Sequence, residues 1–265
     1  MIASSKNARG AISKWVLLRV LWRSFFIQAA SNFERMQNVG LCFCISPALR
    51  KLYSGEDLNQ ALQRHLQFFN THPYMSGALI GASIRIEEEI ANGTRQPDDV
   101  SNFKRYMMGP MAAIGDSFFW ASLRPFAAAW AVMGVLSGIL WAPIGFLILF
   151  NLCHLGLRTF GLFYGYRDGE QICERIHKLA LVKFADRTHY LAALFLGAIA
   201  AIFADRAMNS PFRLADGVEP FLLFSMMLIF LLGLKRSISM VSLLYLAAFG
   251  TASLVMFLNS AFPIM

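Results

Sequence analysis

The sequence predicts an all-α, polytopic membrane protein with broken or re-entrant helices and an amphipathic interfacial helix at its N-terminus. Apolar residues make up 57% of the 265 positions and charged residues only 15%, whereas soluble domains are about 45–50% apolar and about 25% charged. The apolar residues fall in long runs without sustained period-two alternation, which favours membrane helices over strands. Several runs are short or interrupted, and irregular backbone survives at membrane depth only against protein or a water-filled cavity.

The charge distribution indicates a membrane surface as a partner and excludes nucleic acid. The formal net charge is +8, and the first 33 residues hold five basic residues and no acid. Basic clusters beside apolar runs mark the cytoplasmic face and attract anionic lipid. The four cysteines form no CxxC pair and no Cys/His spacing typical of a metal site. Without a nucleotide-binding motif such as Walker A or GxGxxG, the sequence predicts no metal and no cofactor.

We divide the chain into a basic amphipathic N-terminal helix, residues 1–30, and a membrane-embedded domain, residues 31–265. Arg19 and Arg23 are four residues apart and share one helical face. Charges within this apolar stretch argue against a signal peptide. We expect the arginines to face lipid headgroups, and the following large apolar side chains to face lipid or protein: Trp15, Leu18, Trp22, Phe25 and Phe26.

The first half of the embedded domain reads as three helices. These are an apolar stretch over 39–53 that contains Pro47, an amphipathic helix over 56–69, and a helix over 73–91 that stops at Asn92-Gly93. A charged loop is expected over 94–105.

The second half is more apolar. Residues 107–123 are interrupted by glycine, proline and Asp116, which predicts a broken helix. Residues 125–152 are the longest charge-free run and are long enough to span a bilayer. The remaining expectations are a polar connector over 154–178, a short apolar segment over 190–204, a polar loop over 205–219, and apolar segments over 220–234 and 238–259.

Asp116 is the first candidate functional residue, because a carboxylate inside an apolar membrane segment is costly and marks a functional site by default. A structural alternative is that Asp116 caps a half-helix that begins near Ser117, accepting backbone N–H bonds. The two interpretations are compatible, since a capped broken helix can line a sugar site.

Asn70-Thr71-His72-Pro73 is the second candidate. Asn and His side chains donate and accept hydrogen bonds, as sugar hydroxyls require. The alternative is a simple turn between two helices, with Pro73 in the first turn of the second helix.

Glu87-Glu88-Glu89 is the third candidate. Acids near a helix C-terminus oppose the helix dipole, and Arg85 offsets this by pairing with Glu88 and Glu89. The group is either a solvated helix end, a hydrogen-bond acceptor for sugar hydroxyls, or a docking surface for a cytoplasmic partner.

Taken together, five blocks of sequence resemble the IID component of the mannose-type (mannose/fructose/sorbose) phosphotransferase systems. The resemblance covers roughly residues 20–260, and the second and fourth blocks together are specific. The blocks are Asn32–Gly40, His65–Pro73, Glu87–Glu89, Gly109–Trp120 and Tyr164–Tyr166. Ala113 stands where the family often has glycine, and the last 50 residues agree mainly in hydrophobic pattern.

The resemblance implies a multi-pass protein of the bacterial cytoplasmic (inner) membrane that pairs with a IIC membrane subunit, as a trimer of IIC–IID pairs. Phosphate would pass from phosphoenolpyruvate through cytoplasmic IIA to IIB, which phosphorylates the incoming sugar, so IID itself carries no phosphohistidine. The residues expected to bind a hexose or amino sugar are Asn70, Thr71, His72, Glu87, Asp116 and Ser117.

Two alternatives to this function remain open. The chain could scaffold a IIC subunit without touching sugar, or it could be a secondary sugar transporter that needs no phosphate donor.

Overall fold

The computed structural model describes residues 12–208, 218–236, 238–239, 241–243, 245–246, 249–250 and 253. The chain divides into two compact units, Met1–Ile199 and Ala200–Met265. The regular elements of the described residues are all helical, apart from two isolated β-bridges. The predicted all-α class is therefore confirmed, and the candidate site lies entirely in the first unit.

Helix α1 (Lys14–Ser24) is amphipathic, but its faces differ from the predicted ones, because Arg19 is exposed on the same side as Trp15, Leu18 and Trp22. Val16, Leu17 and Val20 are buried in the core, whereas Trp15 and Trp22 stay exposed on the opposite side. The helix is shorter than the predicted segment, because turns replace it after Ser24. One expectation for the arginines is wrong: Arg23 does not reach outward but donates to the Phe43 carbonyl (3.1 Å) and to Ser46 Oγ (2.8 Å).

Helices α2 (Asn38–Leu52), α3 (Gly55–His65) and α4 (Ser76–Ala91) follow. Gly93, with φ +76°, ends α4 where the sequence predicts the stop. Helix α3 ends four residues earlier than predicted. The backbone leaves the helix after His65 because two residues of the first sequence block bind carbonyls of the following segment, as the site geometry below shows.

The predicted break around Asp116 is absent. Helix α5 (Pro97–Gly115) continues through a π-helical segment, η1 (Asp116–Leu123), into α6 (Arg124–Leu136). The interruption in the sequence therefore makes the helix wider over Asp116–Leu123 and does not end it. The charged loop is also shorter than expected, since Pro97 begins α5 and the Asp99 carboxylate accepts the Gln96 backbone N–H at 3.0 Å.

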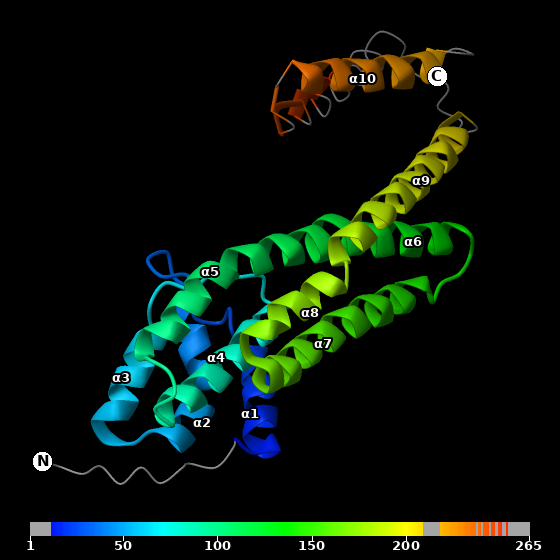
Figure 1. Ribbon diagram of the computed structural model, residues 1–265. Helices are drawn as coiled ribbons and strands as arrows, with labels where there is room; N and C mark the ends of the chain where they lie inside the picture. Colours follow the sequence, from blue (N-terminus) through cyan, green and yellow to red (C-terminus); the bar gives the residue numbers. More distant parts are fainter. Residues whose placement is uncertain are drawn as a thin grey trace, which may run out of the picture. The chain divides into compact units, whose positions relative to one another are not determined.

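The charge-free run 125–152 is not one span, so that prediction is wrong. Helix α6 ends at Leu136, the chain turns, and α7 (Ala142–Asp168) returns antiparallel to α6 (Figure 1). Gly138 makes the turn possible, because its φ of +87° is costly for residues with a Cβ. The result is an apolar helical hairpin in place of a single long helix.

The predicted polar connector over 154–178 is also wrong. Helix α7 runs through most of it, followed by η2 (Gly169–Gln171) and α8 (Ile172–Lys178). Two glycines in this range, Gly161 and Gly165, are packing positions. Gly77 and Gly81 of α4 meet Gly161 and Gly165 of α7, and a Cβ at any of the four would lie only 2.2–2.8 Å from backbone of the other helix. Such four-residue spacing of small residues is typical of close membrane-helix pairs.

Helices α9 (Leu181–Met208) and α10 (Val218–Lys235) complete the described elements. Helix α9 is longer than the short segment predicted over 190–204. The predicted loop over 205–219 lies largely outside the described residues, as does most of the predicted segment over 238–259. Two helical stretches, Pro97–Leu136 and Ala142–Phe203, are long and apolar enough to cross a membrane.

Candidate functional site

The loop between α3 and α4 carries Asn70, Thr71 and His72, and the first sequence block fixes its path. Gln37 binds both sides of the Thr71 residue: its Nε2 donates to the Thr71 carbonyl (2.9 Å), and its Oε1 accepts from the Thr71 N–H (3.2 Å). The Gln37 N–H donates to the Phe69 carbonyl (2.8 Å), and Asn38 Nδ2 donates to the Leu66 carbonyl (2.9 Å). The first and second blocks are therefore one structural unit.

His72 is the point where the second and fourth blocks meet. Its ring packs so tightly on Gly115 that a Cβ there would lie 2.4 Å from the imidazole. The ring stacks on Phe119, with centroids 5.2 Å apart, and lies 5.3 Å from the Trp120 ring. His72 is only 2% exposed, so this histidine shapes the site from beneath its surface.

The hydrogen bonds of His72 define its tautomer. Nδ1 accepts from the Tyr74 N–H at 3.3 Å, so the ring proton is on Nε2. That nitrogen is buried and has no hydrogen-bond partner within the described part of the chain. Burial, followed by the positive charges of Arg158 and His154, lowers the pKa of His72 to about 4, which keeps the ring neutral at physiological pH.

The side chains of Asn70 and Asp116 are exposed and free. Neither makes a hydrogen bond or ion pair with any other described residue, and the same holds for the half-buried Ser117. Asp116 therefore does not cap a half-helix, and that interpretation is wrong: η1 begins without any side-chain cap. The carboxylate and the amide remain available to an external ligand.

Glu87 lies in a different environment, fully buried at the far end of α4. Its carboxylate accepts from Arg64 Nε (2.7 Å) and Nη2 (3.0 Å), from His65 Nε2 (2.8 Å), and from the Tyr53 hydroxyl (2.7 Å). Burial raises the pKa of Glu87, but the hydrogen bonds from His65 and Arg64 outweigh it and lower the pKa to about 2. The charged carboxylate is therefore saturated by donors of the protein itself.

Lys104 of α5 extends this network to the loop. Its Nζ donates to the Arg64 carbonyl (2.8 Å) and to His65 Nδ1 (3.2 Å). One turn further along α5, the Met108 carbonyl accepts from Thr71 Oγ1 at 3.1 Å. Helix α5 thus holds both ends of the segment between His65 and Thr71, which positions Asn70.

The electrostatics of His65 agree with this arrangement. Burial and the charge of Lys104 lower the pKa of His65 to about 4. The neutral ring donates from Nε2 to Glu87 and accepts at Nδ1 from Lys104, so both nitrogens have partners. His65 is therefore a buried histidine whose two ring nitrogens both have hydrogen-bond partners.

The structure thus separates the predicted site residues into two places. Thr71 and His72 lie against α5, Thr71 at Met108 and His72 at Gly115, which directly precedes Asp116 and Ser117, and Asn70 precedes them in the loop. Glu87 is eleven positions along α4 from Ser76, about 16 Å at 1.5 Å per residue. Its neighbours do what the sequence predicts: Arg85 pairs with Glu88 (3.1 Å) and Glu89 (3.0 Å).

The third and fifth blocks meet next to Glu87. The Tyr166 hydroxyl of α7 donates to the Glu88 carboxylate at 3.0 Å. Sequence analysis missed several residues of the site, because the partners of a buried charge are far apart in the chain. Only Arg158 left a signal in the sequence, as a cation within the apolar part of α7. It is 2% exposed and donates to the Pro73 carbonyl (2.9 Å) and to the Ser24 carbonyl.

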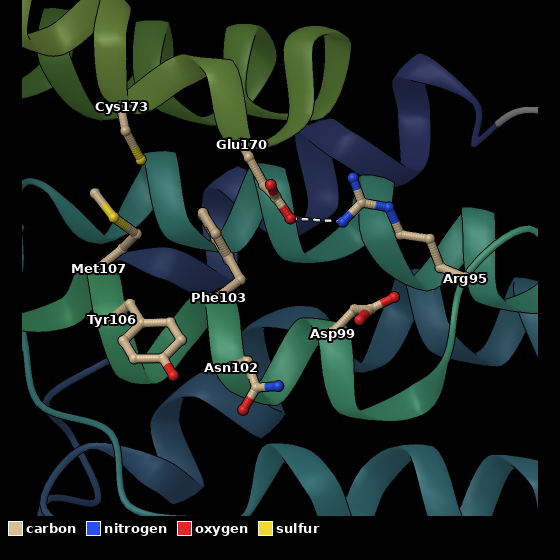
Figure 2. A pocket seen from close by; sticks show the side chains of 8 residues that line it. All are labelled: Arg95, Asp99, Asn102, Phe103, Tyr106, Met107, Glu170 and Cys173. Carbon is tan, nitrogen blue, oxygen red and sulfur yellow. Dashed lines mark hydrogen bonds and ion pairs between the residues drawn. The ribbon is translucent and has the colours of Figure 1, made fainter.

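A pocket of about 300 Å³ lies elsewhere, between the start of α5 and the η2–α8 segment (Figure 2). Arg95 crosses its rim and pairs with Glu170 (2.5 Å) and Glu89 (2.8 Å). None of the predicted sugar-binding residues lines it, so we assign no sugar contact to this pocket. Its lining residues are Arg95, Asp99, Asn102, Phe103, Tyr106, Met107, Glu170 and Cys173.

Comparison with known proteins confirms the resemblance that the five blocks carry. Residues 11–257 match the family described as the PTS system mannose/fructose/sorbose family IID component. The chain belongs to this family. It is 40% identical to the mannose-specific EIID component of Escherichia coli K12 over 183 residues, which cover 68% of this chain and 65% of that protein. It is 35% identical to the fructose permease IID component of Bacillus subtilis over 190 residues, covering 71% and 69%.

Solved membrane-protein structures have the same fold. One is described as the cryo-EM structure of the mannose transporter ManYZ in complex with microcin E492. It matches with a TM-score of 0.57 and 30% identity, covering 92% of this chain and 97% of that chain. A second, described as the structure of a membrane protein, matches with a TM-score of 0.69 and 29% identity over 92% and 98%. The IID family member described here is therefore a membrane protein.

Proposed function

We propose that this chain is the IID membrane subunit of a sugar phosphotransferase permease. With a IIC partner it translocates a hexose or amino sugar, and IIB phosphorylates the sugar as it arrives. The support is family membership, together with the loop 66–71, which is hydrogen-bonded to Gln37, to α2 and to α5 while Asn70 and Asp116 stay exposed. That pairing of fixed backbone with unpaired polar side chains is the observation that carries the proposal.

The residues act in different ways. Asn70 and Asp116 hydrogen-bond sugar hydroxyls, with Ser117 beside them. Thr71 and His72 shape the surface by holding the loop on α5 and on Gly115. Glu87 acts through the loop and not on the sugar, because its oxygens already have four donors. Phosphate never resides on this chain: IIB carries it to the bound sugar, and phosphorylation prevents the sugar from returning.

We propose the following setting from the resemblance to the family. The chain is a multi-pass protein of the bacterial cytoplasmic membrane, arranged as a trimer of IIC–IID pairs that receives phosphate through IIA and IIB. Residues 1–30 form a segment on the membrane surface, and residues 31–265 form the embedded domain. The exposed tryptophans of α1 are suited to that surface position.

The first test is Asp116→Ala in membrane vesicles that contain the complete IIA, IIB and IIC set. Loss of a charged hydrogen bond costs about 1.5–3 kcal/mol, so phosphoenolpyruvate-dependent uptake should fall by about tenfold or more. The matched control is Ala113→Ser, one turn earlier on the same helix and also exposed. Wild-type uptake by the Asp116→Ala complex would contradict the assigned role.

A second candidate function is a scaffold for IIC that makes no sugar contact. The saturated Glu87 network favours it, since such a network stabilises a framework and binds nothing. Sugar binding by the purified IIC–IID pair separates the two functions. If Asn70→Ala and Asp116→Ala leave sugar affinity unchanged and reduce pair formation, the chain is a scaffold. Uptake of unmodified sugar without phosphoenolpyruvate would instead identify a secondary transporter.

A further inference from the structure

A polar stripe runs along the outer side of the long α5–η1–α6 helix. Asp116, Trp120 and Arg124 are spaced four residues apart, so they lie on one side of the helix. All three are exposed, and the Trp120 side chain is 38% exposed. Phe119 and Leu123, which directly precede Trp120 and Arg124 in the sequence, are buried. The stripe therefore extends the exposed surface at Asp116 along the helix to Trp120 and Arg124.

The charges of the stripe are not neutralised within the protein. The guanidinium carbon of Arg124 lies 5.4 Å from the centroid of the Trp120 ring. Across the described residues, no carboxylate pairs with Arg124 and no cation pairs with Asp116. The stripe lies within Pro97–Leu136, a stretch apolar enough to cross a membrane. Because charged side chains facing lipid are strongly disfavoured, the stripe must face a polar environment.

The stripe is also held in place from behind. The Trp120 ring contacts His72, at 5.3 Å between centroids, and Tyr74, at 5.7 Å. The indole is therefore fixed on the same histidine that anchors the Asn70 loop. A fixed aromatic surface costs less conformational entropy on binding than a mobile one.

The chemistry of the stripe fits a hexose. A carboxylate accepts from sugar hydroxyls, a guanidinium donates to them, and an indole covers the apolar face of a pyranose ring. We propose that Trp120 and Arg124, together with Asp116, form this chain's contact surface for the hexose in the translocation path. This rests on the proposed permease function and adds two residues to its site.

The test is phosphoenolpyruvate-dependent uptake of mannose, fructose and sorbose by vesicles that hold the full complex. Trp120→Ala and Arg124→Ala should each raise the KM of the transported sugar by about tenfold, the loss of one good contact, while Vmax stays within about threefold. Trp120→Phe and Arg124→Lys should rescue part of the affinity. Val132→Ala, exposed two turns beyond Arg124, is the matched control and should behave as wild type. Copurification with IIC should be unchanged in every variant.

Three results would overturn the proposal. An unchanged KM in both alanine variants would show that the stripe does not touch sugar. Loss of IIC copurification with an unchanged KM would make the stripe a subunit contact, and Trp120→Phe and Arg124→Lys would reveal this even if an alanine variant misfolds. If wild-type vesicles take up none of the three sugars, the proposed function itself fails, and the stripe proposal fails with it.

Discussion

At the scale of single residues, the Glu87 carboxylate is the most densely bonded group in the site. Tyr53 follows α2, Arg64 and His65 end α3, and Lys104 belongs to α5, so one acid on α4 connects four segments. Buried ion pairs contribute little when intact, but removing one partner leaves the other charge buried and unpaired. The position of the loop 66–71 therefore depends on every residue of the Glu87 network.

We predict that Glu87→Ala destabilises the protein strongly. It leaves Arg64 without its carboxylate and removes the acceptor of His65, a change that typically costs about 3–5 kcal/mol. Thermal unfolding of the detergent-purified protein, followed by tryptophan fluorescence, measures the effect. Glu89→Ala is the control on the same helix, since this acid is half-exposed and should cost about 1 kcal/mol or less. Equal melting temperatures for the two variants would contradict the prediction.

Stability should also fall on acidification in two steps. The pKa of His65 is about 4 in the folded protein and 6.5 normally, so only the unfolded chain gains a proton between these values. Stability is therefore lost as pH falls from about 6.5 to 4. Glu87 titrates near pH 2 when folded and near 4.5 when unfolded, which removes further stability between those values.

The measurement is the melting temperature as a function of pH. His65→Gln should reduce, but not abolish, the fall in melting temperature between pH 6.5 and 4. The remaining fall in melting temperature comes from His72, because burial lowers the pKa of this residue to about 4 as well. A profile that is flat in wild type over this range would exclude the neutral, buried state of both histidines.

At the scale of elements, the crossing of α4 and α7 decides the architecture. The two helices approach through Gly77, Gly81, Gly161 and Gly165, with no side chain between their backbones. The crossing joins the end of α4 near His72 to the helix that carries Arg158. The positions of α4 and α7 relative to each other therefore determine where His72 and Arg158 lie in the site.

We predict that Gly161→Ala prevents stable folding, whereas Gly156→Ala is tolerated. A Cβ at Gly161 would lie 2.8 Å from the Ala78 nitrogen, but a Cβ at Gly156 meets nothing within 4 Å. Both substitutions lie on α7 and change helix propensity equally, so the comparison isolates the clash. Size-exclusion profiles of the two purified variants give the answer, and a monodisperse Gly161→Ala protein would argue against a close crossing.

Element predictions succeeded where local chemistry decides the structure and failed where packing decides it. The stop of α4 at Gly93 and the pairing of Arg85 follow from the local sequence alone. The α6–α7 hairpin was missed because hydropathy counts apolar residues but does not record where the chain turns. Residues 154–178 were interpreted as a polar connector because sequence does not show the helix that packs against Gly161 and Gly165.

At the scale of the whole molecule, the five sequence blocks predicted the family, but not the geometry of the candidate site. The contact of His72 with Gly115 joins residues that are 43 positions apart in the sequence. The Glu87 network needs four segments at once. Periodicity and motif spacing describe neighbours along the chain, so they could name Glu87 as important without revealing that its oxygens are already occupied.

The outer surface of the first unit is apolar over much of the hairpin. Leu140 and Trp141 at its tip are 82% and 64% exposed, and the turn beside them donates backbone N–H groups internally, for example from Ile139 to the Gly134 carbonyl at 2.9 Å. A turn in a low-dielectric environment needs its backbone N–H groups to be hydrogen-bonded within the protein in this way. The hairpin therefore suits lipid or an apolar partner surface, in contrast to the polar stripe on the same helix.

The glycine crossing has a mechanical consequence. Two backbones in direct contact have no flexible side chains between them, so they can neither slide nor roll without steric overlap. In the proposed transport cycle, helices α4 and α7 therefore move together as one rigid body. For the proposed permease function, any rearrangement therefore takes place outside the α4–α7 crossing.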